Sequence, residues 1–578
     1  MKTTLFIKSV VAGALMASFS CTHDILDITP SSFNQTVVYN DPALLKDVVT
    51  GVYIGIRHPF DDENSLLDGL TDNAYNKQGS GQATRFYTYG LTTDASGENV
   101  TRSLWQTAYT YIQKVNTILE NTKTSSVDPA VLSEMSGELY FIRAFLYFDL
   151  LRWYGGVPII TKAYGLNETS YEVSRNSVDE VVTFVVQECD NAIAHLPKLA
   201  DQESGRASQE AAMALKGRVL LYAASPLFNP NNDQSKWVAA RDANKALLDL
   251  GTVQLVNTPE EYGDLFHGKQ TKEIIFARYF TTINNQGWGV NTWLLSGASS
   301  GWTDTSPTQD LVDNYELVSG KLPAEDPAYD NQNPYVNRDP RFGQSILYQG
   351  AGFADPTIRA NRAAQYFMDS QKPSSVDLSG KDSRLYTPFV ANNSLTGYNF
   401  IKYSDPGKLG QGVGGPDTNT NPFIFFRIAE VYLNYAETQL ALGNEGEARS
   451  AINTVRSRVG MPAVTESGPD LVQRYRRERR IELVLEDHRF FDIRRWKIGP
   501  EALNKPATGV IVINKSGDPT NLNIEYHYVD YAAGDGSKIP IVVDGDGTRK
   551  WIDRLYLLPI PPSEIQKSNG ALQQNPGY

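Results

Sequence analysis

The sequence predicts a mainly α-helical protein in which a loop-rich segment and short strands interrupt a series of paired helices. Three observations predict this fold class. Apolar residues recur every three or four positions in segments of about 15 to 20 residues. Start and stop signals bound several of these segments. Between residues 252 and 422, by contrast, Gly, Asn, Asp, Ser and Pro dominate, and a loop-rich stretch of this length inside a compact protein is usually functional.

Six helices are predicted in the first half of the chain. The third ends at Gly155 and Gly156, and the fourth begins at Ser177 with Glu180 as the partner of a capping box. In chain order, the helices are expected from Asp41 onward, at 102–121, at 130–153, from Ser177 to near Pro197, from Ser208 to Ala224, and at 235–249.

The second half is predicted to return to helices after the loop-rich segment. A strand-like piece, Glu273–Tyr279, lies inside that segment. Helices are expected at Phe425–Leu442, at Glu445–Val459 with Asn444 and Glu447 as its cap, and at 469–488. Residues 506–558 read as short strands and turns.

The helix pair around residue 443 indicates how the helices are arranged. Ala429, Tyr432, Ala436 and Ile452 have the small and aromatic character of tetratricopeptide packing. We therefore predict a tetratricopeptide-like helical-repeat scaffold, divided by the insertion. An irregular helical bundle is the alternative.

The N-terminus has the layout of a secretory signal peptide. Lys2 and Lys8 precede an apolar run from Val10 to Phe19, and Cys21 follows at the expected cleavage point. The run is about half the ~20 residues needed to cross a bilayer. We predict lipidation of Cys21, which would anchor the mature protein to a membrane. An ordinary signal peptide with an incidental cysteine is the alternative.

These signals divide the chain into six parts. They are a signal peptide (1–20), a lipid-anchored extended tether (21–40), an N-terminal helical-repeat part (41–251), a loop-rich ligand-binding part (252–422), a C-terminal helical part (423–505), and C-terminal strands and turns packed on the core (506–578).

Composition excludes several functional classes. The 578 residues carry a formal net charge of −13, which argues against nucleic acid as a partner. The six histidines are scattered without the spacing of metal ligands, so a zinc enzyme is not expected. No cofactor is predicted. Gly410–Gly415 matches a dinucleotide-binding pattern, but no strand precedes it and no helix follows it, so we interpret it as a loop. Cys189 lies in an apolar helical run and is expected to be a packing residue.

Three tryptophans form the candidate ligand platform. Trp288, Trp293 and Trp302 lie close together in Gly-, Asn- and Ser-rich sequence. They could line a sugar-binding surface, with Asn291 offering hydrogen bonds to hydroxyl groups. Tryptophan is also a common buried plug, and for Trp293 packing is an equal alternative.

Two segments resemble a known family. The first is Cys21-Thr-His-Asp-Ile-Leu-Asp-Ile-Thr-Pro30. The second is the C-terminal pair Arg474–Trp496 and Tyr556–Ile565, after which the chain ends Asn575-Pro-Gly-Tyr578. Together they closely resemble the SusD/RagB family of outer-membrane glycan-binding lipoproteins. The Arg474–Trp496 segment is itself interpreted as an ion-paired structural helix, with Arg479–Glu482 and Glu486–Arg489 pairs.

The resemblance implies a non-catalytic, cell-surface protein on the outer membrane. It implies that the protein binds an oligosaccharide and delivers it to a SusC-like TonB-dependent transporter. The RagB branch handles peptides, which keeps a second ligand class open, and a secreted glycoside hydrolase is a further alternative. By region only, the resemblance adds Asp72, Asn73, Tyr75 and Arg85 to the candidate ligand site.

Overall fold

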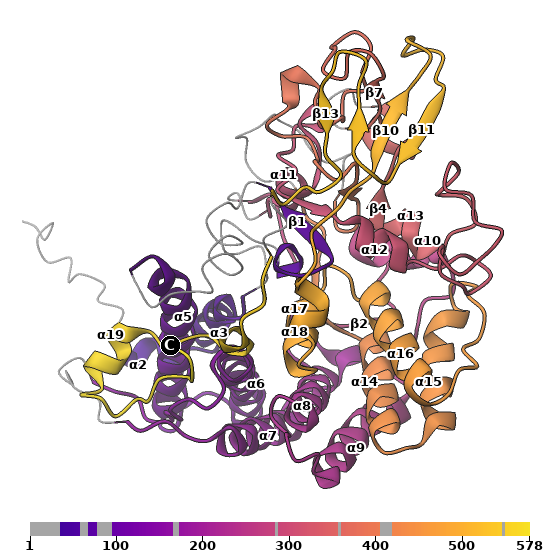
Figure 1. The fold of residues 1–578 in the computed structure, drawn as a ribbon. Coiled ribbons are helices and arrows are strands. Elements are labelled where there is room, and N and C mark those ends of the chain that lie inside the picture. The colour runs from indigo at the N-terminus through magenta and orange to yellow at the C-terminus, as the bar shows by residue number, and fades with distance from the viewer. Residues whose placement is uncertain are drawn as a thin grey trace, which may run out of the picture.

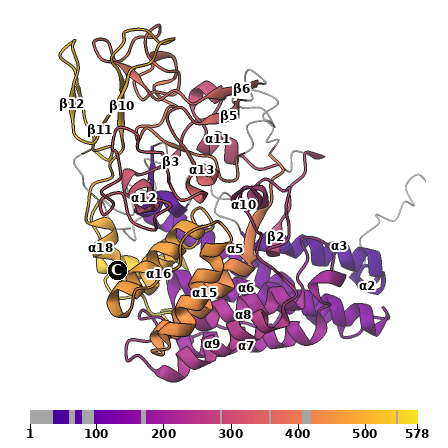
Figure 2. The same ribbon diagram turned by 90° about the vertical axis from the view of Figure 1, so that its right-hand side faces the viewer.

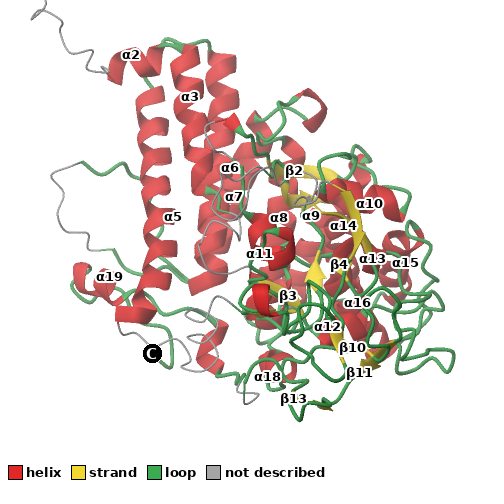
Figure 3. Ribbon diagram, turned by 90° about the horizontal axis from the view of Figure 1, so that it is seen from above, coloured by secondary structure: helices red, strands yellow, loops and turns green. Residues whose placement is uncertain are grey.

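The computed structural model consists of a layer of long helices beneath a lobe of loops and short strands (Figure 1). It describes residues 35–57, 67–77, 95–165, 173–283, 287–355, 360–404, 419–545 and 549–578. Cys21, Arg85 and the glycine run 410–415 lie outside these ranges. Seen from above, the N-terminal helices lie on one side, and most of the loops lie on the other, among the remaining helices (Figure 3).

The long helices begin and end largely where the sequence predicts. Their bounds are α3 Pro42–Val52, α5 Ala95–Thr122, α6 Pro129–Tyr154, α7 Val178–His195, α8 Gln209–Ala224, α9 Gln234–Leu250, α14 Ile428–Ala441, α15 Glu445–Ser457 and α16 Gly468–Glu482. The predicted capping box is present, since the Ser177 side chain accepts from the Glu180 backbone and Glu180 bonds back to Ser177. Ser208 caps α8 with its side chain, which accepts from the Ala211 backbone N–H.

Consecutive helices pack against one another in series. The series runs from α5 through α9 (Figure 2) and then continues into α14 and α15 (Figure 1), although about 180 residues separate α9 from α14 in the chain. The mainly helical fold is therefore confirmed, while the assignment of these pairs to the tetratricopeptide type stays a prediction. None of the described helices is both long and apolar enough to cross a bilayer. Cys189 is fully buried in α7, as expected.

The remaining helices are short. They are α2 Gln35–Asn40, α10 Pro259–Phe266, α11 Val290–Leu294, α12 Gln309–Asn314, α13 Arg341–Ser345, α17 Arg489–Arg495, α18 Gly499–Leu503 and α19 Pro562–Lys567. Because α2 is helical, the predicted extended tether 21–40 is wrong over its last six residues.

The strands join segments that are distant in sequence. β1 (Ala74–Asn76) pairs antiparallel with β3 (Thr305–Pro307), and β2 (Ile274–Arg278) pairs antiparallel with β9 (Phe423–Arg427). The C-terminal strand β10 (Ile511–Asn514) lies between β11 (Ile524–His527) and the parallel β7 (Met368–Asp369) of the insertion. Three short pairs complete the set: β4 Ile346–Leu347 with β8 Asn399–Phe400, β5 Gly352–Asp355 with β6 Ala360–Ala363, and β12 Tyr531–Ala532 with β13 Lys538–Ile539.

Three predicted helix boundaries are corrected. The helix predicted from Phe425 begins at Ile428, because the preceding residues pair with β2. Asn444 occupies the N-cap position of α15, but its side chain makes no capping hydrogen bond and donates to Gln439 instead. The predicted 469–488 helix ends at Glu482, since Leu485 and Asp487 have positive φ angles of 61° and 67°, which an L-residue adopts only outside a regular helix.

A buried network of carboxylates and guanidinium groups connects the two layers. Glu482 accepts hydrogen bonds from Arg341 (2.8 Å) in the insertion, from Arg427 (2.5 Å) at the end of β9, and from Arg458 after α15. Glu478 bonds Arg341 and Arg456, and Glu486 bonds Arg427 and Lys402. All of these side chains are nearly inaccessible to solvent.

The ion pairs of this region differ from the predicted ones. Arg479 pairs with Asp492 at 2.8 Å rather than with Glu482, and Arg489 pairs with Asp72 rather than with Glu486. The segment is ion-paired and structural, as predicted. Its partners, however, lie in other elements. The turn at 483–488 breaks the helical spacing between Glu486 and Arg489, whereas Arg479 pairs across this turn with α17 although Glu482 shares its helix.

We expect Glu482→Gln to lower the free energy of unfolding by about 3–5 kcal/mol. The substitution keeps the side-chain shape but leaves three buried guanidinium groups with one carboxylate fewer, and an uncompensated buried charge is costly. Urea unfolding of the purified protein measures the change. The matched control is Glu525→Gln, which breaks a partly exposed pair with Lys515 and should leave the stability nearly unchanged, because surface ion pairs contribute little. Equal effects of the two variants would contradict the role of the network.

Acid should unfold the protein through its paired glutamates. Burial raises the pKa of Glu437, but Arg495 outweighs burial and lowers that pKa from its ordinary 4.5 to about 2. A carboxylate whose pKa is lower in the folded state than in the unfolded state stabilises the protein at any pH above its unfolded-state pKa. This stabilisation is lost as the pH falls toward the folded-state pKa. Stability should therefore decline below about pH 4.5, and Glu437→Gln should make this decline shallower.

Asp487 should have the opposite dependence on pH. Burial raises the pKa of Asp487 to about 7. Its contribution to the stability of the fold is therefore complete below its ordinary pKa of 3.8 and is lost as the pH rises toward 7. Asp487→Asn should flatten that part of the curve alone. Thermal melts of both variants between pH 3 and 8 measure the two effects. Identical curves for wild type and both variants would contradict both assignments.

Candidate functional site

Two of the three predicted tryptophans form a pair at the surface of the upper lobe. Trp293 lies in α11, and Trp302 follows it after a short turn. Their ring centroids are 5.3 Å apart and their planes are at 89°, an edge-to-face arrangement that fixes both rings. The Trp302 backbone N–H donates to the Thr292 carbonyl at 2.6 Å. Both side chains are half-buried, so each keeps part of its surface accessible to a ligand.

A second loop holds the turn between the two tryptophans. The Gly297 backbone N–H donates to the Asn392 carbonyl at 2.9 Å and to Asn393 Oδ1 at 3.1 Å. A Cβ atom at Gly297 would come within 2.9 Å of Phe389. Any larger residue at this position would therefore push the 389–393 loop away from the tryptophan pair.

Lys77 extends this arrangement to the segment around residue 72. Its Nζ donates to the carbonyls of Val390 (2.7 Å) and Asn393 (2.8 Å), in the loop that holds the tryptophan turn. Burial, with a smaller contribution from the positive charge of Arg384, lowers the pKa of Lys77 to about 8. The structure thus brings two distant segments together at one place, through the β1–β3 pair and Lys77.

Tyr75 lies two residues before Lys77, and the charge of Arg384 acts on the pKa of both side chains. Tyr75 is opposite Ser306 in the β1–β3 pair and is half-buried. Burial raises its pKa, and the Asp544 carboxylate adds to the shift. Burial also lowers the pKa of Arg384 to about 10. Tyr75 is therefore the one residue of the predicted 72–85 group whose described surroundings are compatible with contact to a ligand.

Trp288 lies in the core rather than on a surface platform. It is 4% exposed, and its ring stacks on Phe280 with centroids 4.9 Å apart and planes at 5°. Its Nε1 donates to Asn419 Oδ1 at 3.1 Å. Asn291 is also buried and accepts from the Asn419 side chain. These contacts give both residues a structural role, so the predicted centre of the platform moves to Trp293 and Trp302.

Asp72 and Asn73 are also buried, and their polar atoms hold other elements in place. Asp72 receives two hydrogen bonds from Arg489, at 2.9 and 2.8 Å. Asn73 accepts from Arg480 at 2.6 Å and donates to Asp68 at 2.5 Å. The two residues dock β1 onto α16 and α17. Arg85 lies outside the described residues.

Sequence reasoning missed Lys77, Arg384, Phe389 and the 389–393 loop. The three residues are isolated polar or aromatic positions, and the loop has no periodic pattern. No local signal in the sequence therefore marks them. Within the described ranges, no group of three His, Cys, Asp or Glu side chains could hold a metal ion.

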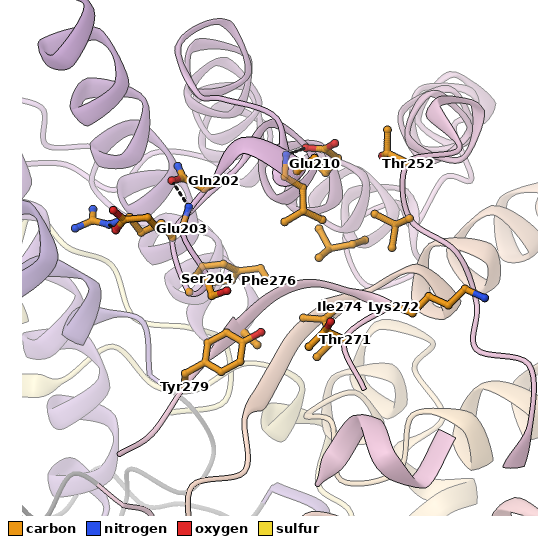
Figure 4. Close-up of a pocket in the computed structure, with 17 residues that line it drawn as sticks. Gln202, Glu203, Ser204, Glu210, Thr252, Thr271, Lys272, Ile274, Phe276 and Tyr279 are labelled. Atoms are coloured by element: carbon orange, nitrogen blue, oxygen red, sulfur yellow. Dashed lines mark hydrogen bonds and ion pairs between the residues drawn. The ribbon is translucent and has the colours of Figure 1, made fainter. Parts of the chain in front are cut away.

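A cavity of about 310 Å³ lies away from the tryptophan pair, between the 199–206 loop and β2 (Figure 4). Gln202, Ser204 and Lys272 contribute polar groups, and Tyr279, which is 43% exposed, contributes an aromatic ring. Gln202 is already engaged, since its side-chain oxygen accepts from the Glu203 backbone. The cavity could hold a small polar ligand, but it has one exposed aromatic ring where the tryptophan site has a fixed pair.

Comparison with models of protein families identifies the family of this chain. Residues 272–578, just over half of the chain, match the model of the SusD family. Residues 24–221 match a SusD-like family described as starch-binding and associating with the outer membrane.

The chain is a member of the SusD family.

Curated and structural relatives agree with this membership. The SusD-like protein P38 of Formosa agariphila is 24% identical over 427 residues, which cover 70% of this chain and 74% of the relative. A crystal structure of a SusD-like protein from Bacteroides fragilis has a TM-score of 0.74 at 28% identity, covering 94% of this chain and 98% of that one. A SusD-like carbohydrate-binding protein from the same species has a TM-score of 0.70 at 25% identity, covering 93% and 99%.

Proposed function

We propose that this SusD family member binds an oligosaccharide or polysaccharide at the cell surface and delivers it to a SusC-like TonB-dependent transporter. The observation that carries the proposal is the half-buried, edge-to-face pair of Trp293 and Trp302 on the loop-rich lobe. Family membership and the carbohydrate-binding relative from B. fragilis support it.

The tryptophan pair suits a sugar for physical reasons. A pyranose offers a flat C–H face that packs on an aromatic ring, and a ring already fixed by its neighbour loses little conformational freedom on binding. Lys77 supplies a polar group at the same place. Among the described residues its ammonium uses two of its three donors, so one is available to a hydroxyl group.

The proposed role is capture without catalysis. Stacking and a few hydrogen bonds give modest affinity, because a hydrated sugar gives up water to bind. Modest affinity allows the ligand to be released to a transporter. The family description as associating with the outer membrane supports this location, and the predicted lipidation of Cys21 supplies the means of attachment.

We expect Trp302→Ala and Trp293→Ala each to weaken binding of the cognate glycan by about 2 kcal/mol, roughly 30-fold. Isothermal titration after a screen of polysaccharides and peptides measures this change. Tyr279→Ala is the control, because this exposed aromatic residue lies at the cavity beside β2, away from the tryptophan pair (Figure 4). Trp288→Ala should instead lower stability by about 3–5 kcal/mol, which unfolding experiments would detect.

The screen also distinguishes the rival functions. Release of new reducing ends from a polysaccharide would identify a glycoside hydrolase, and retention of peptides without any glycan would identify a RagB-type function. If Tyr279→Ala loses glycan binding while both tryptophan variants keep it, the site is the cavity beside β2.

The anchor and the transporter are tested together in native cells. We expect the wild-type protein to fractionate with the outer membrane and to co-purify with a barrel protein. Cys21→Ala should leave the membrane fraction, since the acyl chains would be lost. Retention of Cys21→Ala in the membrane would contradict the anchor, and purification of the wild-type protein without a barrel would contradict the transporter partner.

A further inference from the structure

A small cavity is lined by residues of α16, α17 and α18. Its volume is about 170 Å³. Gln473, Arg476 and Arg477 line it from α16, at positions that share one helical face with Arg480. Arg489 lines it from α17, and Lys505 lines it from the segment after α18.

Cations outnumber carboxylates around this cavity. Asp72 is held by Arg489 and lies 3.4 Å from Arg480. Asp310, behind the cavity wall, is held by Arg480 and Lys505. These carboxylates and the exposed Glu501 balance three of the five cationic side chains. The cavity therefore keeps an excess of two positive charges.

Arg476 and Arg477 carry this excess. Arg476 is half-buried over the ring of Trp496, 5.1 Å from its centroid, and no described residue forms an ion pair or hydrogen bond with it. Burial lowers its pKa, although Glu437 and Glu501 act in the opposite direction. Arg477 reaches only to 3.5 Å from Glu316, which already receives Arg456 and Arg474.

A partly buried guanidinium without a bonded counterion carries a desolvation cost that a bound anion would offset. Guanidinium groups also match the planar or tetrahedral oxygens of carboxylate, sulfate and phosphate. The cavity is smaller than the ~300–1,000 Å³ typical of sites for larger organic ligands, so one oxyanion group fits it better than a sugar chain.

We propose that this cavity is an oxyanion-binding site, in which Arg476 and Arg477 hold a carboxylate, sulfate or phosphate group and Gln473 donates to it. The site is separate from the tryptophan pair, and the proposal does not depend on the proposed glycan function. The anion is either a small free ion or the acidic group of a larger sugar.

Thermal shift and isothermal titration with sodium sulfate test the proposal, with sodium chloride at matched ionic strength as the reference. Wild-type protein should bind sulfate, and Arg476→Gln should weaken binding at least tenfold. Arg477→Gln should weaken it as well, and it tests the site independently if Arg476→Gln fails to fold. Arg241→Gln, which removes a partly exposed arginine of α9 paired with Asp242, should leave sulfate binding unchanged.

Further titrations with phosphate, glucuronate and glucose 6-sulfate identify the source of the anion. Binding of all these anions supports a site for simple oxyanions. Binding of the two acidic sugars more tightly than sulfate and phosphate supports a site for an acidic sugar substituent. Sulfate stabilisation of equal size in wild type, Arg476→Gln and Arg477→Gln would overturn the proposal, because it would reflect a general salt effect on the protein surface.

Discussion

The carboxylates of Glu478, Glu482 and Glu486 are the interaction on which the rest of the structure depends. They receive cations from β9, from α15 and its following turn, and from the insertion. When these elements pack together, each buries a charge that water can no longer solvate. Each therefore requires the opposite charge that another element supplies. Apolar packing can hold two helices in several registers, whereas hydrogen bonds of fixed geometry accept one arrangement. The network therefore sets how the lobe sits on the helical layer.

The same arginine-rich region positions the candidate glycan site at a distance. Arg480 and Arg489 hold Asn73 and Asp72, which fixes the start of β1. β1 in turn pairs with β3, and the chain just before β3 carries Trp302. Lys77, one residue beyond β1, bonds the loop that supports the turn between the tryptophans. Asp72 and Asn73, which were predicted to contact the ligand, thus instead hold in place the segments whose residues can contact it.

Local signals in the sequence predict the helices well and the site only by region. Asp41, Ser177 with Glu180, and Ser208 mark helix starts because capping involves residues within one turn. The pairing of Arg479 failed for the opposite reason: its partner Asp492 lies beyond a turn that no periodicity announces. Trp288 and Trp302 occur in similar polar sequence, yet Phe280 and Asn419 bury the first. Whether a tryptophan is a plug or a platform depends on neighbours that the local sequence does not contain.

The bond between Asp72 and Arg489 joins residues 417 positions apart, and this separation orders events during folding. Contacts between residues far apart in the chain form after local ones, because the entropy of closing the intervening loop must be lost first. The helices from α5 to α9 make mostly contacts between neighbours in the chain and can assemble before the distant bond forms. The β1 segment cannot be fixed until α16 and α17 arrive. The lobe that carries the tryptophan pair is therefore expected to reach its final form after the helices from α5 to α9.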